Sequence, residues 1–159
     1  MMKYLTKVVC LFGLALSALA ADVTITTGQQ GMTYNAVYGA NLQSALTEFG
    51  YRVQVVTSKG SLDNLSKVAS GEAQLGLTQG DAYQYWRSKN INAAQSVEII
   101  GELPNECVFI AVKEGGKVKD EDDLKAGVKI AVGEPTSGSF ASWSYLQSLQ
   151  ADYAKVDTS

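Results

Sequence analysis

The sequence contains no histidine and little proline and cysteine. The lack of histidine excludes a Ser-His-Asp triad and a histidine general base, and it removes the commonest zinc ligand. Cysteine occurs only at Cys10 and Cys107. If Cys10 is removed with an export signal, no internal disulfide can form, so the fold depends on a hydrophobic core. We expect Cys107, within an apolar run, to be a small buried hydrophobe.

A block of basic residues is also missing. The chain has 13 Lys and Arg against 16 Asp and Glu, which gives a net charge of −3. Nucleic-acid binding needs clustered Lys and Arg that displace counterions, so it is not expected here.

The one long apolar run lies at the N-terminus. Lys3 and Lys7 precede the apolar stretch Val8–Ala15, and Ala18-Leu19-Ala20 forms a small-residue cleavage site. This pattern predicts a signal peptide over residues 1–20 and export of the rest. The run is shorter than the roughly 20 residues of a membrane span, so no stable membrane insertion is expected. Cleavage leaves 11 basic residues against 16 acidic ones, a net charge of −5.

Downstream, short apolar runs alternate with helical patterns, which predicts an α/β fold with a mainly parallel sheet. The expected strands are 23–25, 53–56, 75–78, 97–100, 108–112, 128–132 and 153–156. The expected helices are 33–49, one capped by Ser61, one from Asp81 to Trp86, 121–125 and 140–149.

A change in composition divides the chain. Residues 114–127 are polar and charged, and the pattern of a strand, a glycine turn and a helix restarts after them. We expect a first lobe over residues 21–113, a linker with a short helix over 114–127, and the start of a second lobe over 128–159. The acidic cluster at 120–123 suits a solvated helix start, and it lacks the regular ligand spacing of a calcium loop.

Four turns, at 26–33, 58–61, 79–81 and 133–139, follow predicted strands and lead into helices. Ligands of open α/β sheets bind outside the carboxyl ends of the strands, where helix N-termini favour anions. The turns lack the endings of a P-loop and of a Rossmann fingerprint, so no nucleotide is expected. With no histidine and no calcium-loop spacing, no metal is expected, and no other cofactor is predicted.

Some residues allow two interpretations. Asp81 is either a helix N-cap or a partner for a ligand ammonium group. Tyr34 lies beside a turn and is expected in the cleft wall, whereas Trp143 is expected in the core. Asn64-Leu65-Ser66 matches a glycan acceptor, which we expect to be a chance match.

The motifs Thr27-Gly28, Thr33-Tyr34 and Gly39 resemble the first loop of the TAXI family of solute-binding proteins, which serve TRAP transporters. Residues 60–82 and 106–139 resemble the family's second signature and its linker with the following Gly-Ser loop. The resemblance implies a type II periplasmic binding protein, with no enzymatic activity, whose two lobes close around a small carboxylate or amino acid. Family members are about twice as long, so the resemblance implies a truncated chain with an incomplete second lobe.

The ligand-binding residues expected from the turns and the resemblance are Thr27, Gly28, Gln29, Thr33, Tyr34, Ser58, Gly60, Ser61, Asn64, Gln79, Asp81, Thr136, Ser137, Gly138 and Ser139. Gln29 and Gln30 replace smaller residues of the family and suggest an altered ligand preference. A binding protein of an ABC importer, or a sensor of the same fold, is an alternative. A serine hydrolase with a Ser58-Lys59 pair is disfavoured, because adjacent strand residues point to opposite faces.

Overall fold

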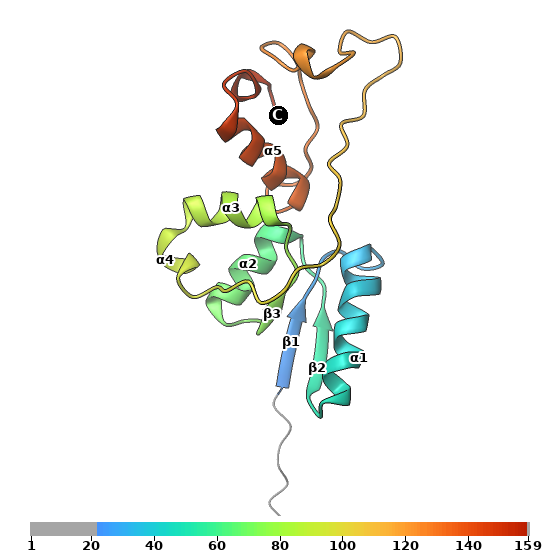
Figure 1. The fold of residues 1–159 in the computed structure, drawn as a ribbon, viewed down its shortest axis with the longest axis vertical. Coiled ribbons are helices and arrows are strands. Elements are labelled where there is room, and N and C mark those ends of the chain that lie inside the picture. The colour runs from blue at the N-terminus through green and yellow to red at the C-terminus, as the bar shows by residue number, and fades with distance from the viewer. Residues whose placement is uncertain (1–21, 159) are drawn as a thin grey trace, which may run out of the picture.

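A computed structural model of the chain describes residues 22–158, so the predicted signal peptide lies outside the described residues. Its centre is a parallel sheet of β1 (Asp22–Thr26), β2 (Arg52–Val56) and β3 (Leu75–Gly76), in the order β2-β1-β3 (Figure 1). Ile25 of the central strand lies opposite Val55 on one side and Leu75 on the other, and it is fully buried. The predicted α/β class and parallel sheet are confirmed.

Helices follow each strand. A π-helix η1 (Tyr34–Gly39) runs into α1 (Ala40–Glu48), and α2 (Ser61–Ser70) links β2 to β3. The next helices are α3 (Gly80–Lys89) and the short α4 (Ile91–Ala94). The chain leaves β1 toward β2 and returns past it to β3, so the strand order reverses at β1. The carboxyl ends of strands at such a reversal form a crevice where α/β proteins bind ligands.

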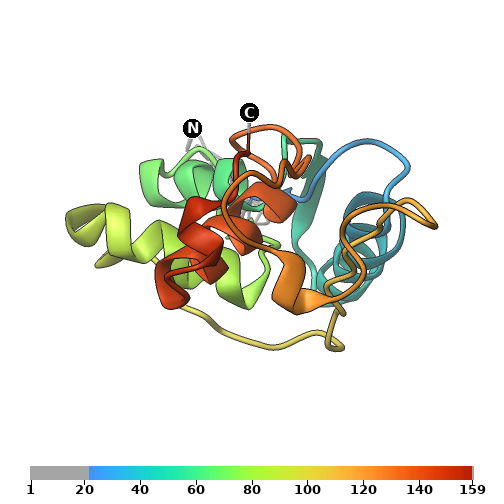
Figure 2. The same cartoon turned by 90° about the horizontal axis from the view of Figure 1, so that it is seen from above.

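The second part of the chain builds a smaller core. Its helices are the 3₁₀ turn η2 (Glu121–Asp123), α5 (Gly138–Leu149) and the 3₁₀ turn η3 (Tyr153–Lys155). Trp143 is buried and stacks on Tyr153 with ring centroids 5.4 Å apart, which confirms Trp143 as a core residue. The buried members of this core are Leu124, Val132, Trp143, Tyr153 and Val156. Helix α5 lies over α3 in both views (Figure 1, Figure 2). Between these helices, Phe140 meets Tyr85 edge to face.

Two predicted strands, 97–100 and 108–112, are wrong. Residues 98–112 have extended or irregular backbone and no neighbouring strand among residues 22–158. A β-strand requires hydrogen bonds to a neighbouring strand, and a run of apolar residues does not by itself provide that neighbour. Cys107 lies in this segment and is exposed, so its predicted burial is also wrong.

The predicted strands at 128–132 and 153–156 reduce to one parallel bridge between Lys129 and Asp157, while Tyr153–Lys155 is helical. Strand 75–78 is shorter than predicted, because only Leu75 and Gly76 pair with β1.

Two helices begin earlier than expected. Gly60 and Gln79 hold the N-cap positions of α2 and α3, so Ser61 and Asp81 are helical residues rather than caps. No helix within residues 22–158 is both long and apolar enough to cross a membrane.

Candidate ligand-binding site

The first turns of three helices meet at one place. Helices α2, α3 and α5 begin at Ser61, Gly80 and Gly138, and the turns before them touch. The Leu62 N–H donates to the Thr136 carbonyl at 3.3 Å. Gly60 has φ +127°, and a Cβ there would lie 3.0 Å from the Ser137 Cα. Glycine at position 60 therefore permits both the backbone conformation and the close approach of the two parts of the chain.

The side chain of Gln79 lies where the three helix starts meet. The Ser61 hydroxyl is 3.4 Å from the Gln79 carboxamide oxygen and 3.4 Å from its backbone nitrogen. A methyl group at position 138 would overlap the same carboxamide oxygen, so Gly138 makes room for it. Helix N-termini carry partial positive charge and unpaired N–H groups. A neutral oxygen atom thus lies where an anion would be favoured.

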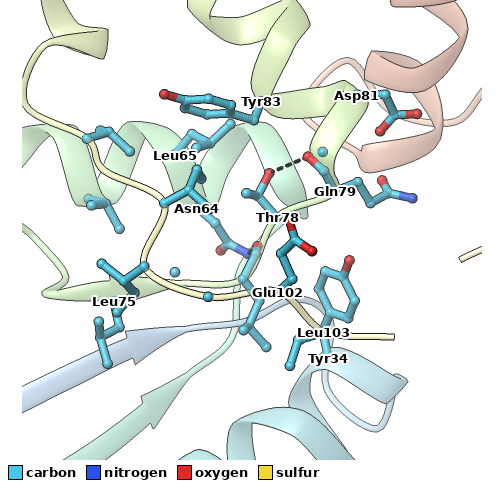
Figure 3. A pocket seen from close by; sticks show the side chains of 18 of the residues that line it. Tyr34, Asn64, Leu65, Leu75, Thr78, Gln79, Asp81, Tyr83, Glu102 and Leu103 are labelled. Carbon is cyan, nitrogen blue, oxygen red and sulfur yellow. Dashed lines mark hydrogen bonds between the residues drawn. The ribbon is translucent and has the colours of Figure 1, made fainter. Parts of the chain in front are cut away.

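Next to these helix starts is a cavity of about 1030 Å³. Its walls are the β3 edge with residues 77–81, part of α2, the extended segment 96–108, and Tyr34 of η1. Figure 3 shows Tyr34, Gln79 and Glu102 around this space, with Asp81 nearby at the start of α3. The cavity runs along β3 and past its carboxyl end, next to the point where the strand order reverses.

The charge of the cavity lining has one sign. The lining residues include no Lys or Arg, and they include four carboxylates, which are those of Asp81, Glu98, Glu102 and Glu106. The Gln79 carboxamide donates to Glu106 Oε2 at 3.3 Å and so connects the acidic wall to the helix starts. Asp81 Oδ1 accepts the N–H of Ala82 at 2.7 Å, and its carboxylate also lines the cavity. An acidic wall favours a cationic group on the ligand.

Tyr34 is held in its neutral form. Its ring is half-buried, and burial raises the pKa of its hydroxyl well above the usual value, as do the carboxylates of Glu106 and Asp81. The phenol therefore keeps its proton and can donate a hydrogen bond into the cavity.

Thr27 and Asn64 make hydrogen bonds within the fold. The Thr27 hydroxyl donates to the Val56 carbonyl at 3.0 Å and accepts from Asn35 Nδ2 at 3.1 Å. Asn64 is fully buried, and its carboxamide bonds to Thr26, Thr27 and Leu77 at 2.6 Å each. These contacts hold α2 to the ends of β1 and β3, so both residues position the turns that surround the cavity.

The remaining expected residues are more dispersed. Gly28 is buried and its carbonyl accepts the N–H of Ser58, whose hydroxyl in turn accepts the N–H of Gly60. Ser137 caps α5 by accepting the Phe140 N–H at 3.2 Å. The exposed members, which do not line the cavity, are Gln29, Thr33 and Ser139. The structure thus brings together Tyr34, Gly60, Ser61, Gln79, Asp81, Thr136, Ser137 and Gly138.

Sequence reasoning missed Glu98, Glu102 and Glu106. These three acids recur every four residues, and residues 90–112 contain no basic residue. The sequence shows this asymmetry, but a prediction of strands at 97–100 and 108–112 gives no reason to place these acids at the cleft.

Within the described part of the chain, no cluster of three or more potential ligands is arranged to hold a metal ion. In the acidic segment, the Glu121 carboxylate accepts the Tyr153 hydroxyl and Asp123 accepts the Lys119 N–H. These two acids therefore have structural partners.

A family model described as the NMT1-like family matches residues 25–159, which is most of the chain. This family comprises solute-binding proteins with the periplasmic-binding-protein fold. The parallel sheet, the reversal of strand order at β1 and the cavity at the strand ends agree with that fold. The chain belongs to the NMT1-like family of solute-binding proteins.

Proposed function

We propose that this protein captures a small amino acid, or a closely similar zwitterion, outside the cytoplasm and delivers it to the membrane subunits of a TRAP transporter. The observation that carries the proposal is the contact between two oppositely charged environments. Three helix N-termini meet around Gln79, and four carboxylates line the adjoining cavity. A ligand with both a carboxylate and an ammonium group matches this arrangement.

In this proposal the ligand carboxylate replaces the Gln79 carboxamide oxygen beside the Ser61 hydroxyl and the α5 N-terminus. The ammonium group faces Asp81 and Glu106, and the Tyr34 hydroxyl donates to a ligand oxygen. Each part of the chain then supplies some of the contacts, as in hinge-closing binding proteins.

The same groups favour binding over turnover. The chain has no histidine, and the hydroxyls of Ser58 and Ser137 accept backbone N–H groups next to them. An activated nucleophile needs a general base as its hydrogen-bond partner, and the partners of these two hydroxyls are backbone N–H groups.

Isothermal titration calorimetry with L-glutamate, L-glutamine and succinate tests the ligand class. We expect both amino acids to bind at least about tenfold more tightly than succinate, because succinate lacks the ammonium group that the acidic wall favours. Asp81→Asn and Glu106→Gln should reduce that preference. Glu48→Gln, at the exposed end of α1, is the matched control. Preferential binding of succinate, or no binding by the panel together with turnover of a substrate, would contradict the proposal.

The transporter type is tested separately by uptake into vesicles that contain the candidate membrane subunits. A TRAP transporter requires an ion gradient and no ATP. Uptake that requires ATP would instead assign the protein to an ABC importer, and ligand binding without any uptake would favour a sensor.

A further inference from the structure

The Gln79 side chain is held only by long contacts, although its backbone is fixed. The Gln79 carbonyl accepts the Tyr83 N–H at 3.0 Å at the start of α3. The carboxamide oxygen lies 3.4 Å from the Ser61 hydroxyl, and the carboxamide nitrogen lies 3.3 Å from Glu106 Oε2. Protein hydrogen bonds are usually shorter, about 2.5–3.2 Å between the heavy atoms. These two contacts therefore stabilise the position of the side chain only weakly.

The Ser61 hydroxyl beside Gln79 is buried and lacks a short hydrogen bond. Only 3% of the Ser61 surface is exposed. Its two hydrogen bonds within residues 22–158, to the Gln79 carboxamide oxygen and from the Gln79 N–H, are both 3.4 Å long. Burying a hydroxyl without a good partner costs free energy. A stronger acceptor at this place, such as a carboxylate oxygen, would pair better with the Ser61 hydroxyl.

The Gln79 carboxamide has the polarity of the head group of an amino acid. Its oxygen faces Ser61 and the start of α5, where Gly138 leaves room for it, and its N–H group faces Glu106. In the proposed function, a ligand carboxylate and a ligand ammonium group take these same two places. Residues 98–112 make no backbone–backbone hydrogen bond, so no such bond fixes Glu106 beside Gln79. Both ends of the carboxamide can thus exchange partners.

We propose that the Gln79 side chain is an internal competitor of the ligand and that it sets the affinity of the site. This inference rests on the proposed function and adds how the same site is regulated. Without a ligand, the carboxamide occupies the place of the head group and bridges Ser61 to Glu106. Binding requires the side chain to rotate out while the backbone of α3 stays in place. The apparent affinity for every ligand is then reduced in proportion to the fraction of molecules in which the place is open.

Isothermal titration calorimetry of Gln79→Ala with L-glutamine and L-glutamate tests the competition. We expect both amino acids to bind about three- to tenfold more tightly than to the unmodified protein, by the same factor, because the competitor is lost for both. Gln95→Ala is the matched control, because Gln95 is exposed after α4 and does not line the cavity. Weaker or unchanged binding in Gln79→Ala, or a gain for one amino acid only, would overturn the proposal.

Gln79→Glu tests the same competition in the opposite direction. The Glu106 and Asp81 carboxylates repel the new carboxylate toward the helix N-termini, which attract it. It should therefore compete more strongly than the carboxamide and weaken the binding of L-glutamine at least about tenfold. Far-UV circular dichroism checks that the variant is folded. Binding as tight as in the unmodified protein would contradict an internal competitor.

Nuclear magnetic resonance follows the Gln79 side chain without any substitution at the site. Its carboxamide signals are identified by their absence in Gln79→Ala. On saturation of the unmodified protein with L-glutamine, they should move toward the positions of a solvated amide, while the Gln95 signals stay in place. Unchanged Gln79 signals at saturation would show that the side chain does not leave.

The failure of this inference is distinguishable from that of the proposed function. If neither the unmodified protein nor Gln79→Ala binds L-glutamine, L-glutamate or succinate, both proposals fall. If the unmodified protein binds an amino acid but Gln79→Ala does not bind it more tightly, the proposed function stands and the competition is refuted.

Discussion

At the scale of single residues, Asn64 is the side chain most constrained by its surroundings. It is fully buried, and its carboxamide bonds to the Thr26 hydroxyl and to the carbonyls of Thr27 and Leu77. A hydroxyl donor, two carbonyl acceptors and one amide match without leaving a polar atom unpaired, which only asparagine achieves at this size. A buried side chain of this kind also cannot carry a glycan, in agreement with a chance match of the Asn-Leu-Ser motif.

Replacing Asn64 with alanine should lower the free energy of unfolding by about 3 kcal/mol. The substitution leaves three buried polar partners unsatisfied, and such losses cost about 1–3 kcal/mol each before relaxation and water entry reduce the total. Urea unfolding followed by circular dichroism measures the change. Asn41→Ala, at an exposed position of α1, should change stability by less than about 0.5 kcal/mol. A similar effect of both substitutions would show that the Asn64 bonds contribute little.

The position of Asn64 also shows what the sequence could and could not predict. The sequence predicts Asn64 as a ligand-binding residue, and in the structure its carboxamide bonds to Thr26, Thr27 and Leu77 within the fold. Its direction was not predictable, because α2 must pack on β3 before Asn64 reaches Leu77. Tyr34 and Gln79 are predicted binding residues from the turns and the resemblance, and both line the cavity.

At the scale of helices and strands, the sequence predicts the bounds of one helix and two strands closely. Helix α5 was predicted at 140–149 and runs from Gly138 to Leu149, and β1 and β2 were placed within one residue at each end. Residues 108–112 failed because a strand takes its hydrogen bonds from a partner elsewhere in the chain. The same dependence explains why Val128–Val132 retains only the bridge at Lys129.

The N-terminus of α5 offers a test at this scale. The Ser137 hydroxyl accepts the Phe140 N–H at 3.2 Å, which is one of the helix's unpaired donors. Ser137→Ala should reduce stability by about 1 kcal/mol, and Ser137→Thr should retain most of the cap. The midpoint of urea unfolding measures both changes. Ser139→Ala is the control, because Ser139 is exposed and two residues further along the same helix. Equal losses at both serines would refute the capping role.

At the scale of the whole molecule, each of the two parts of the chain holds a tyrosine beside a carboxylate. Tyr34 of η1 lies near the Glu106 and Asp81 carboxylates of the cavity wall, and Tyr153 connects η3 to η2 through the Glu121 carboxylate. The hydrogen bond to Glu121, followed by burial, raises the pKa of Tyr153 from 10.0 to about 12. Burial and the Glu106 and Asp81 carboxylates raise the pKa of Tyr34 as well. Both phenols are therefore easier to ionise in the unfolded chain than in the folded one.

This difference predicts a loss of stability in alkali. Since the folded-state pKa values exceed the unfolded value of 10.0, the stabilisation is fully present below pH 10 and is lost as the pH rises toward 12. Unfolding free energies measured by urea titration at pH 8, 10 and 11 should fall across the last two points. Tyr153→Phe should lessen that fall, whereas Tyr51→Phe leaves both phenols in place and should not. An unchanged fall in Tyr153→Phe would contradict the assignment to Tyr153.

The π-helical turns of η1 have a consequence for the length of the chain. A π-helix accommodates one residue more than an α-helix over the same span, so η1 contains a residue that α1 does not need in order to continue straight. Loss of Ala36 could thus be absorbed by a change from π- to α-helical turns, with the preceding loop and the sheet left in register. Helix α2 has no π-helical turn, so a single deletion in it would rotate every later side chain of the helix by about 100°. Insertions and deletions among relatives of this chain should therefore be accepted at η1 far more readily than in α2.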